Sequence, residues 1–495
     1  MDPLKRLAGQ TAIYGLSSIV GRLINFLLVP LYTNILFNTG EYGIIAEMYA
    51  YVAFLLILLT YGMETAFFRF SHQEPAQKQR VYSTTLMSIM STSSLFVLLV
   101  ILFRQPLADI LRHPGHTEYI VWLGIIIGLD TLNAIPFARL RAENKAFAFA
   151  AIKLIGIAAN ILFILLFLVL SPWLLENHPQ SFLAPLISRL YDPSIGVGYV
   201  FISNLIATAI TTILLLPVML TAGFHFSVNT WKTMLRYAWP LILVGMAGVV
   251  NETLDKLLLK YMLPPDIAMS HVGIYSACYK ISVFMTIFIQ AFRFAAEPFF
   301  FAQAAHEQAR EMYARVMKYF VVACLFIFLG IMLFMDIVQY FVGKEFRVGL
   351  AVVPILLMAN LFLGVYFNLS IWYKLTGQTL YGAWIALAGA AITILLNIWW
   401  IPLFGYHGSA WATLICYFAM MVISYLYGQK HYPVPYEMGK ILSMIAMALA
   451  IYLGSTLLPP LPAVAGYAVN IALIGLFAIT VWLIDPVMLK INRKI

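Results

Sequence analysis

Four basic residues lie inside otherwise apolar stretches of the sequence, where a charge is expensive. They are Arg22, Lys256, Lys260 and Lys280. An arginine or lysine at the centre of a bilayer costs about 2.5–3.5 kcal/mol on insertion scales, so such residues normally face a cavity or a charged partner. The four cations therefore predict either contacts with an anion or ion pairs between helices. Lys260 could instead reach the membrane surface with its ammonium group.

The first apolar run places Arg22 on a polar helix face. Its polar residues follow at steps of four, three, four and three: Thr11, Gly15, Ser18, Arg22 and Asn25. This spacing lines one side of a helix. A polar stripe with a central cation predicts that Arg22 faces a cavity, where its guanidinium could bind phosphate in a bidentate manner. The alternative is an arginine paired to an acid for helix packing.

A second stripe carries both signs of charge. It consists of Gly245, Gly248, Glu252 and Asp255, at steps of three, four and three. Lys256 stands four residues after Glu252, a spacing that allows an ion pair on the helix itself. Lys256 is therefore either part of an anion site or neutralised by Glu252. Lys280 has no acid three or four residues away, which favours a binding role.

Two arginines close aromatic stretches at matching places in the chain. Arg69 follows Phe67-Phe68, Arg293 follows Phe292, and the acids Glu64 and Glu297 stand close to them. These four residues either gate the inner mouth of a transport path or are ordinary cytoplasmic anchors.

Other polar residues inside apolar runs have two interpretations each. The isolated acids Glu47 and Asp130 either pair with the cations or bind a coupling ion such as Na⁺ or H⁺. The amides of Asn360, Asn368 and Asn397 either hydrogen-bond between helices or contact a sugar.

The elements that must position these residues are membrane-spanning helices. Of 495 residues, 62% are hydrophobic and 10% are charged, whereas a soluble domain has roughly 45–50% apolar and about 25% charged residues. This composition excludes a soluble enzyme, a disordered chain and a DNA-binding protein, and predicts an all-α polytopic membrane protein with about 14 transmembrane helices. The predicted spans are residues 10–36, 42–68, 81–103, 118–140, 146–171, 197–221, 238–262, 271–296, 314–335, 349–373, 380–401, 408–428, 439–459 and 464–484.

The distribution of lysine and arginine predicts that both termini are cytoplasmic. With the N-terminus inside, 21 of the 30 basic residues lie at inner ends and loops, five lie in outer loops and four lie within spans. Cytoplasmic loops carry such an excess. The longest outer loop, residues 172–196, is too short for a catalytic domain but could form a short interfacial helix.

The sequence also shows a weak internal repeat. Glu41-Tyr42-Gly43-Ile44 opens the second span and His271-Val272-Gly273-Ile274 opens the eighth. This similarity predicts two six-helix lobes, residues 1–225 and 226–435, with spans 13 and 14 appended in residues 436–495. The alternative is that any two hairpin turns look alike.

Several motifs, and the order in which they follow one another along the chain, resemble those of one known family. The run from Gly21 to Leu31, which leads to Glu41-Tyr42-Gly43, resembles the opening of the polysaccharide-biosynthesis flippase family. This family belongs to the multidrug/oligosaccharidyl-lipid/polysaccharide (MOP) exporter superfamily. Leu254-Asp255-Lys256 resembles the family's span 7, where an Asp-Arg pair is usual; Lys256 keeps the charge but loses the bidentate fork. Phe341–Phe346 resembles the loop into span 10.

The resemblance implies both an architecture and a substrate. The two lobes would enclose a central cavity, and spans 13 and 14 would shape a groove for a lipid tail. The substrate would be a polyprenyl-diphosphate-linked oligosaccharide, turned from the inner to the outer leaflet of the bacterial cytoplasmic membrane by alternating access for cell-surface polysaccharide assembly. Arg22, Lys256 and Lys280 would then contact the diphosphate. Other polysaccharide-assembly membrane proteins are possible partners besides membrane lipids; nucleic acid is not.

Two rival functions remain open. A cation-coupled multidrug exporter shares the architecture, and Glu252 and Asp255 keep that option open. A membrane glycan-processing enzyme would need a sizeable outer loop or paired carboxylates, whereas no outer loop exceeds about 25 residues. The widely spaced Cys278, Cys324 and Cys416 predict neither a disulfide framework nor a zinc site. We therefore expect a transporter, not an enzyme, with no cofactor beyond a possible coupling ion.

Overall fold

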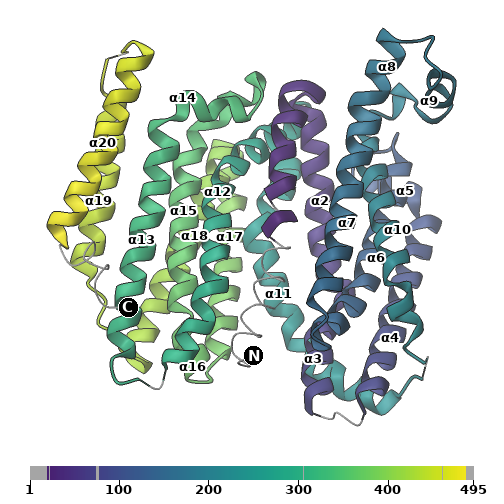
Figure 1. The fold of residues 1–495 in the computed structure, drawn as a ribbon, viewed down its shortest axis with the longest axis horizontal. Helices are drawn as coiled ribbons and strands as arrows, with labels where there is room; N and C mark the ends of the chain where they lie inside the picture. The colour runs from purple at the N-terminus through teal and green to yellow at the C-terminus, as the bar shows by residue number, and fades with distance from the viewer. Residues whose placement is uncertain are drawn as a thin grey trace. The chain divides into compact units, whose positions relative to one another are not determined.

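The computed structural model describes residues 19–21, 23–73, 77–223, 225–304, 306–459 and 461–485, and this part of the chain is helical with no strand (Figure 1). Fourteen helical segments in it are long and apolar enough to cross a membrane. They are Ile19–Leu36, Thr39–Ser71, Lys78–Leu102, Thr117–Ala142, Ala146–Asn177, Gly198–Leu220, Val228–Met262, Pro265–Phe301, Ala309–Leu333, Lys344–Leu375, Leu380–Phe404, Tyr406–His431, Met438–Thr456 and Ala463–Ile484. The predicted all-α, multi-pass class and the order of the spans are confirmed.

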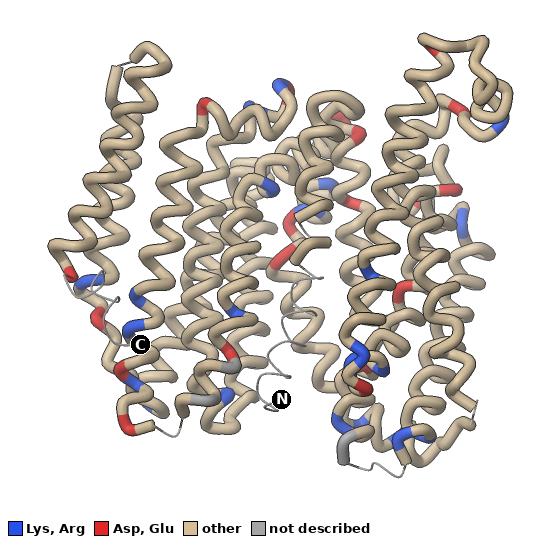
Figure 2. Tube along the Cα trace, in the orientation of Figure 1, with Lys and Arg blue, Asp and Glu red and all other residues tan. Residues whose placement is uncertain are grey.

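The largest boundary difference is at the start of the seventh span. Its helix α11 (Val228–Met262) begins ten residues before the predicted position 238. The residues 229–236 include polar and basic side chains, which an apolar window excludes but a helix tolerates once it leaves the hydrocarbon layer. Charged residues accordingly gather toward helix ends and are sparse in the middle of the spans (Figure 2).

The chain forms two compact units. Unit 1 comprises Met1–Arg22 and Glu41–Leu257, and unit 2 comprises Leu23–Gly40 and Leu258–Ile495. The three boundaries are at 22/23 in the first span, at 40/41 in α2 (Thr39–Thr60) and at 257/258 in α11, so each of these spans contributes to both units. The lobes 1–225 and 226–435, which rest on the sequence repeat, stay a prediction.

Unit 1 is a bundle whose helices pack mainly on α6 and α10. Its helices are α2 (Thr39–Thr60), α3 (Met63–Gln73), α4 (Lys78–Leu102), α5 (Arg104–Ile110), α6 (Thr117–Ala142), α7 (Ala146–Leu165), η3 (Leu166–Leu170), α8 (Ser171–Asn177), α9 (Ala184–Leu190), η4 (Pro193–Ile195), α10 (Gly198–Leu220) and most of α11. α4 packs on α6, and α10 packs on both α6 and α7.

A break between α2 and α3 redirects the second span. Tyr61 and Gly62 both have positive φ angles, 31° and 70°. A Cβ atom at Gly62 would stand 3.0 Å from the carbonyl oxygen of Ala238, so glycine allows α3 to lie close to α11. A buried cluster holds α3 there, and its members include Met63, Phe67, Tyr82, Ile135, Leu215 and Met234.

Unit 2 repeats this packing pattern. Its helices are η1 (Tyr32–Leu36), α12 (Pro265–Gln303), α13 (Ala309–Leu333), α14 (Met335–Val338), η5 (Gln339–Phe341), η6 (Lys344–Val352), α15 (Val353–Leu369), α16 (Ile371–Leu375), α17 (Leu380–Phe404), α18 (Tyr406–His431), α19 (Met438–Thr456) and α20 (Ala463–Ile484). α18 packs on α15 and α17, and α15 packs on α13. Spans 10, 11 and 12 thus contact one another as spans 4, 5 and 6 do, which two copies of one six-helix unit would produce.

Spans 13 and 14 form a hairpin that packs on α13. α19 and α20 contact each other and α13, and they stand at the edge of unit 2 (Figure 1). The Asn470 amide donates to the carbonyl oxygen of Leu333 at 2.6 Å. The turn between the two helices is rich in proline: it contains Pro459 and Pro462, and Pro462 is the N-cap residue of α20.

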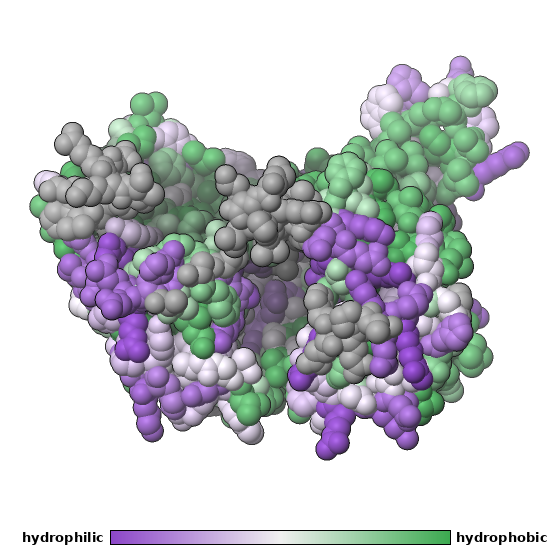
Figure 3. Space-filling model, turned by 60° about the horizontal axis from the view of Figure 1, so that its bottom comes forward, coloured by the Kyte–Doolittle hydropathy of each residue, from purple (hydrophilic) through white to green (hydrophobic). Residues whose placement is uncertain are grey.

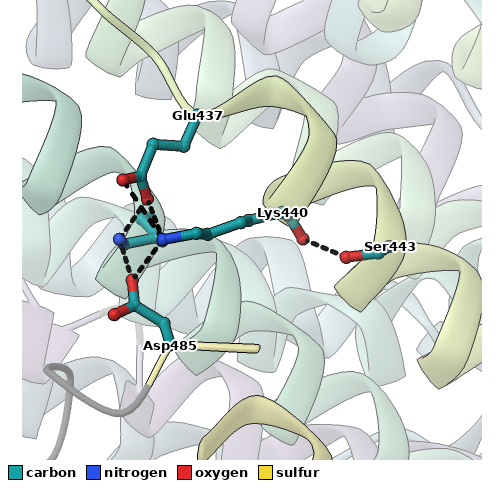
Figure 4. Close-up of polar contacts among 5 residues, drawn as sticks. Glu437, Lys440, Ser443 and Asp485 are labelled. Atoms are coloured by element: carbon teal, nitrogen blue, oxygen red, sulfur yellow. Dashed lines mark hydrogen bonds and ion pairs between the residues drawn. The ribbon is translucent and has the colours of Figure 1, made fainter. Parts of the chain in front are cut away.

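A charge cluster ties the other end of this hairpin to α13. The buried Lys318 ammonium donates to the carboxylates of Glu437 and Asp485, which Figure 4 shows beside Lys440. Lys440 pairs with the same two carboxylates at 3.3 and 3.6 Å. Two cations and two anions therefore balance.

Hydrophilic residues also cover the helix ends that come forward in Figure 3.

Candidate functional site

Each unit has an arginine whose guanidinium carbon lies over an aromatic ring, one near the end of the second span and one near the end of the eighth. The Arg69 guanidinium carbon is 4.3 Å from the ring centroid of Tyr237, and that of Arg293 is 4.1 Å from the centroid of Phe367. Such stacking uses the face of the guanidinium and leaves the N–H groups at its edge able to donate. Within the described residues, neither guanidinium forms an ion pair with a carboxylate.

The two acids near these arginines pair with other cations. Glu64 on α3 pairs with Arg141 at the end of α6, and Glu297 on α12 pairs with Lys374 of α16. In both units, the acid of span 2 or 8 thus pairs with a cation of span 4 or 10. Because these acids are occupied, they do not neutralise the two stacked arginines.

A small cavity of about 20 Å³ lies beside Arg293. Arg293, Lys374 and Asn368 are among its lining residues, and its volume accommodates one water-sized group. Asn368 is 6% exposed; its Nδ2 donates to the carbonyl oxygen of Gly364 at 3.2 Å, while its Oδ1 has no hydrogen-bond partner. Cationic donors beside an unused acceptor suit a hydroxyl group, which can both donate and accept a hydrogen bond.

The cations predicted for the substrate are distributed over both units. Arg22 lies outside the described residues. The Lys256 ammonium is 3.7 Å from Oδ1 of Asp255, and it donates to the backbone carbonyl of Glu252 at 3.3 Å. The ion pair thus joins Lys256 to Asp255, whereas the four-residue spacing predicted the Glu252 carboxylate as its partner. Lys280 is half-buried on α12 and takes part in a polar or electrostatic contact.

Lys260 does not reach the membrane surface as the snorkelling alternative required. It is 3% exposed, and its ammonium lies 5.6 Å from the ring centroid of Tyr261. The helix packing of unit 2 therefore encloses this cation. The Asn360 amide donates to Ser282 on α12, which agrees with the helix-packing interpretation of that asparagine.

Glu47 pairs with a histidine from a distant part of the chain. Its Oε2 lies 2.9 Å from Nε2 of His113, and the two side chains are 0% and 8% exposed. A buried carboxylate requires such a partner. His113 lies in the turn between α5 and α6, 66 residues along the chain from Glu47. No local spacing could have revealed this pair.

Asp130 joins a chain of polar side chains that links three helices of unit 1. The Thr208 hydroxyl of α10 donates to its Oδ1 at 3.3 Å. Asn204, one turn before Thr208, donates to the Tyr49 hydroxyl of α2 at 2.8 Å. Asp130 has no cationic partner among the described residues. An intramembrane carboxylate with only hydroxyl donors is suited to bind a proton or a small cation.

The described part of the chain contains no group of three or more His, Cys, Asp or Glu side chains that could hold a metal ion. Its cysteines are buried thiols in separate helices. Cationic and neutral polar groups, rather than metal ligands, therefore define the candidate site.

Solved structures with the same fold are membrane transporters. The lipid II flippase MurJ in an inward closed conformation is 14% identical, with a TM-score of 0.68 over 96% of this chain and 98% of that chain. An inward-facing multidrug resistance MATE family transporter of the MOP superfamily is 13% identical, with a TM-score of 0.63 over 84% and 94%. The MATE multidrug transporter DinF-BH in complex with R6G is 16% identical, with a TM-score of 0.62 over 88% and 97%. The chain is thus a multi-pass membrane protein with the fold of MOP-superfamily transporters.

Residues 7–303 match the family described as "Polysaccharide biosynthesis protein". This match covers more than half of the chain, and the chain belongs to that family. The resemblance predicted from the motifs is confirmed. No curated protein sequence matches the chain.

Proposed function

We propose that the protein is a flippase that moves a polyprenyl-diphosphate-linked oligosaccharide from the inner to the outer leaflet of the bacterial cytoplasmic membrane. Membership of the polysaccharide biosynthesis family supports a lipid-linked glycan as substrate, and the transporter fold supports translocation. The observation that carries the proposal is the pair of stacked arginines, Arg69 and Arg293, which have no carboxylate partner among the described residues.

The charge of a diphosphate explains why such arginines are useful. A diphosphate presents several anionic oxygens and loses its hydration when it enters the membrane, so it needs cations that acids have not already neutralised. The edge of a stacked guanidinium supplies charge-assisted donors in a fixed orientation. Arg22 and Lys280 would add further contacts, whereas Lys256 would have to exchange the Asp255 carboxylate for the phosphate. In this proposal, both termini are cytoplasmic. Transport proceeds by alternating access, and no bond of the substrate is broken.

Translocation can be measured directly in proteoliposomes. They would contain the purified protein and a polyprenyl-diphosphate oligosaccharide with a fluorescent sugar, and a membrane-impermeant glycosidase would be added outside. We expect the protein to increase the fraction of sugar that the glycosidase reaches. Accessibility equal to that in protein-free liposomes would refute flipping, and appearance of cleaved or newly joined glycan before glycosidase is added would point to the enzyme alternative. Export of a cationic dye in place of the lipid would favour the multidrug alternative.

Arg22 tests the diphosphate contact in the first span. We expect Arg22→Ala to slow translocation by roughly 10- to 100-fold, because a hydrogen bond to a charged group contributes about 1.5–3 kcal/mol. Arg22→Lys should keep part of the activity, since it preserves the charge without the bidentate fork. Normal rates in the alanine variant, at equal protein in the liposomes, would remove Arg22 from the substrate path.

We propose Asp130 as the site of a coupling ion, either H⁺ or Na⁺. Asp130→Asn keeps the hydrogen bond from Thr208 but removes the charge. We expect it to abolish the acceleration of translocation by an imposed pH or Na⁺ gradient, while translocation without a gradient continues. The matched control is Asp109→Asn, which makes the same change at an exposed acid of α5 in unit 1. Gradient-driven acceleration that survives in Asp130→Asn would show that the ion binds elsewhere.

A further inference from the structure

The connection between spans 5 and 6 carries an exposed apolar stripe. Here α8 is followed by the short helix α9, and the two pack through the buried residues Leu174, Ala184 and Ile187. Phe182, Leu186 and Leu190 stand on the outer side and are 95%, 56% and 64% exposed. Leu186 and Leu190 are one turn apart and lie on one face of α9, and Phe182 lies in the turn just before the helix. An exposed stripe of large apolar side chains indicates a surface that is covered in the working protein.

The length of the fifth span places this stripe at a particular depth. α7, η3 and α8 form one helical segment of 32 residues, Ala146–Asn177, which is about 48 Å long. The hydrocarbon core is about 30 Å thick, and the bilayer with its headgroups is about 40–45 Å thick. A centred segment therefore leaves about 9 Å at each end, which is close to the length of α8. α8 thus lies in the headgroup layer.

α9 shares this depth because it packs along α8. In Figure 1, α8 and α9 stand beyond the neighbouring ends of α5 and α10. The remaining exposed residues of the connection are mainly polar, among them Glu176, Asn177, Gln180, Ser188, Arg189 and Asp192. An apolar stripe on an otherwise polar short helix is the pattern of a segment that lies in a membrane interface.

We propose that α9 is an interfacial anchor whose occupant is the phospholipid leaflet itself. Phe182, Leu186 and Leu190 insert at the boundary between headgroups and acyl chains, and Arg189 in the last turn lies at the level of the lipid phosphates. The predicted topology makes this the outer leaflet. The anchor fixes the depth of the outer ends of spans 5 and 6, and it does not depend on which substrate the protein carries.

Spin labels can measure this depth in the full-length protein. The variants Leu186→Cys and Leu190→Cys would be labelled with a nitroxide in liposomes of phosphatidylcholine and phosphatidylglycerol. Ser188→Cys, an exposed position on the same helix, is the matched control. The native Cys278, Cys324 and Cys416 are buried, so the label reacts with the introduced cysteine. The substituted side chains are exposed, so we expect the fold to be preserved.

The depth of each nitroxide label is read from its collision rates with oxygen and with a water-soluble nickel complex. We expect the labels at 186 and 190 to collide more with oxygen than with nickel, and the label at 188 to show the reverse. If nickel reaches all three labels equally, the stripe faces water and the proposal is overturned. If the labels at 186 and 190 are immobilised and shielded from both reagents, a protein surface covers the stripe, which equally overturns a lipid anchor.

Discussion

Replacing Arg293 with alanine should slow translocation of the lipid-linked oligosaccharide by roughly 10- to 100-fold, because a charge-assisted hydrogen bond contributes about 1.5–3 kcal/mol. The Arg293 guanidinium lies 4.1 Å from the ring centroid of Phe367, and its cavity also contains Lys374 and the unpaired Oδ1 of Asn368. Removing the guanidinium leaves Lys374 as the cation at this cavity, and Glu297 already neutralises it. The glycosidase-accessibility assay in proteoliposomes measures this loss.

Two variants separate a role in binding from a role in folding. Arg293→Lys keeps the charge but not the flat stack, and we expect it to retain intermediate activity. Arg310→Ala is the matched control, because Arg310 stacks on Tyr432 at 4.6 Å in the same unit and is not among the residues that line the cavity. It should lose only about 0.5–1 kcal/mol of stability. Equal translocation in Arg293→Ala and Arg310→Ala would make Arg293 an ordinary cytoplasmic anchor.

Replacing Lys318 with methionine should loosen the hairpin of spans 13 and 14. The substitution keeps the apolar stem but leaves the Asp485 carboxylate, which is 4% exposed, without its closest cation. Loss of one partner of a buried ion pair costs about 3–5 kcal/mol, and Lys440 at 3.6 Å from Asp485 offsets part of that cost. We expect faster proteolysis near residue 437 and a lower unfolding temperature in detergent.

Lys440→Met is the control for this cluster. The Lys440 side chain is 39% exposed, and an exposed ion pair contributes about 0–1 kcal/mol. Its loss should therefore change proteolysis little. If Lys318→Met is as stable as Lys440→Met, hydrophobic packing alone holds the hairpin on α13.

The same cluster should weaken in acid. The hydrogen bond from Lys318 holds the pKa of Glu437 below its ordinary value. A carboxyl whose pKa is lowered by folding stabilises the folded state above its unfolded pKa, about 4.3. That contribution is lost as the pH falls through the lower pKa of the folded state. Proteolysis near Glu437 should therefore be unchanged around neutral pH and rise only below about pH 4.

The number, order and type of the helices could be predicted from the sequence because each span is a local signal. A bilayer requires about 20 consecutive apolar residues and a backbone whose hydrogen bonds are satisfied within the segment. The proline-rich turn before α20 was equally local. Predicted boundaries failed mainly at α11, where the helix continues into polar sequence beyond the membrane.

The candidate site was predicted only as a set of charges. Arg69, Arg293, Glu64 and Glu297 were identifiable because charges are rare in apolar runs, and the family resemblance assigned a substrate class to the chain. Arg22, the sharpest of the sequence predictions, lies outside the described residues. Which acid neutralises which cation could not be predicted, and this decides which arginines can bind an anion.

Tertiary structure alone decided those partners. Glu64 pairs with Arg141 across 77 residues of chain, and Glu47 pairs with His113 across 66. Such contacts depend on how the helices pack against one another. Sequence periodicity does not predict this packing, because the faces of a nearly all-apolar helix look alike. The sequence by itself determined a multi-pass transporter fold with a few intramembrane charges. The packing of the helices determined that Arg69 and Arg293 lie on aromatic rings while the acids near them are occupied.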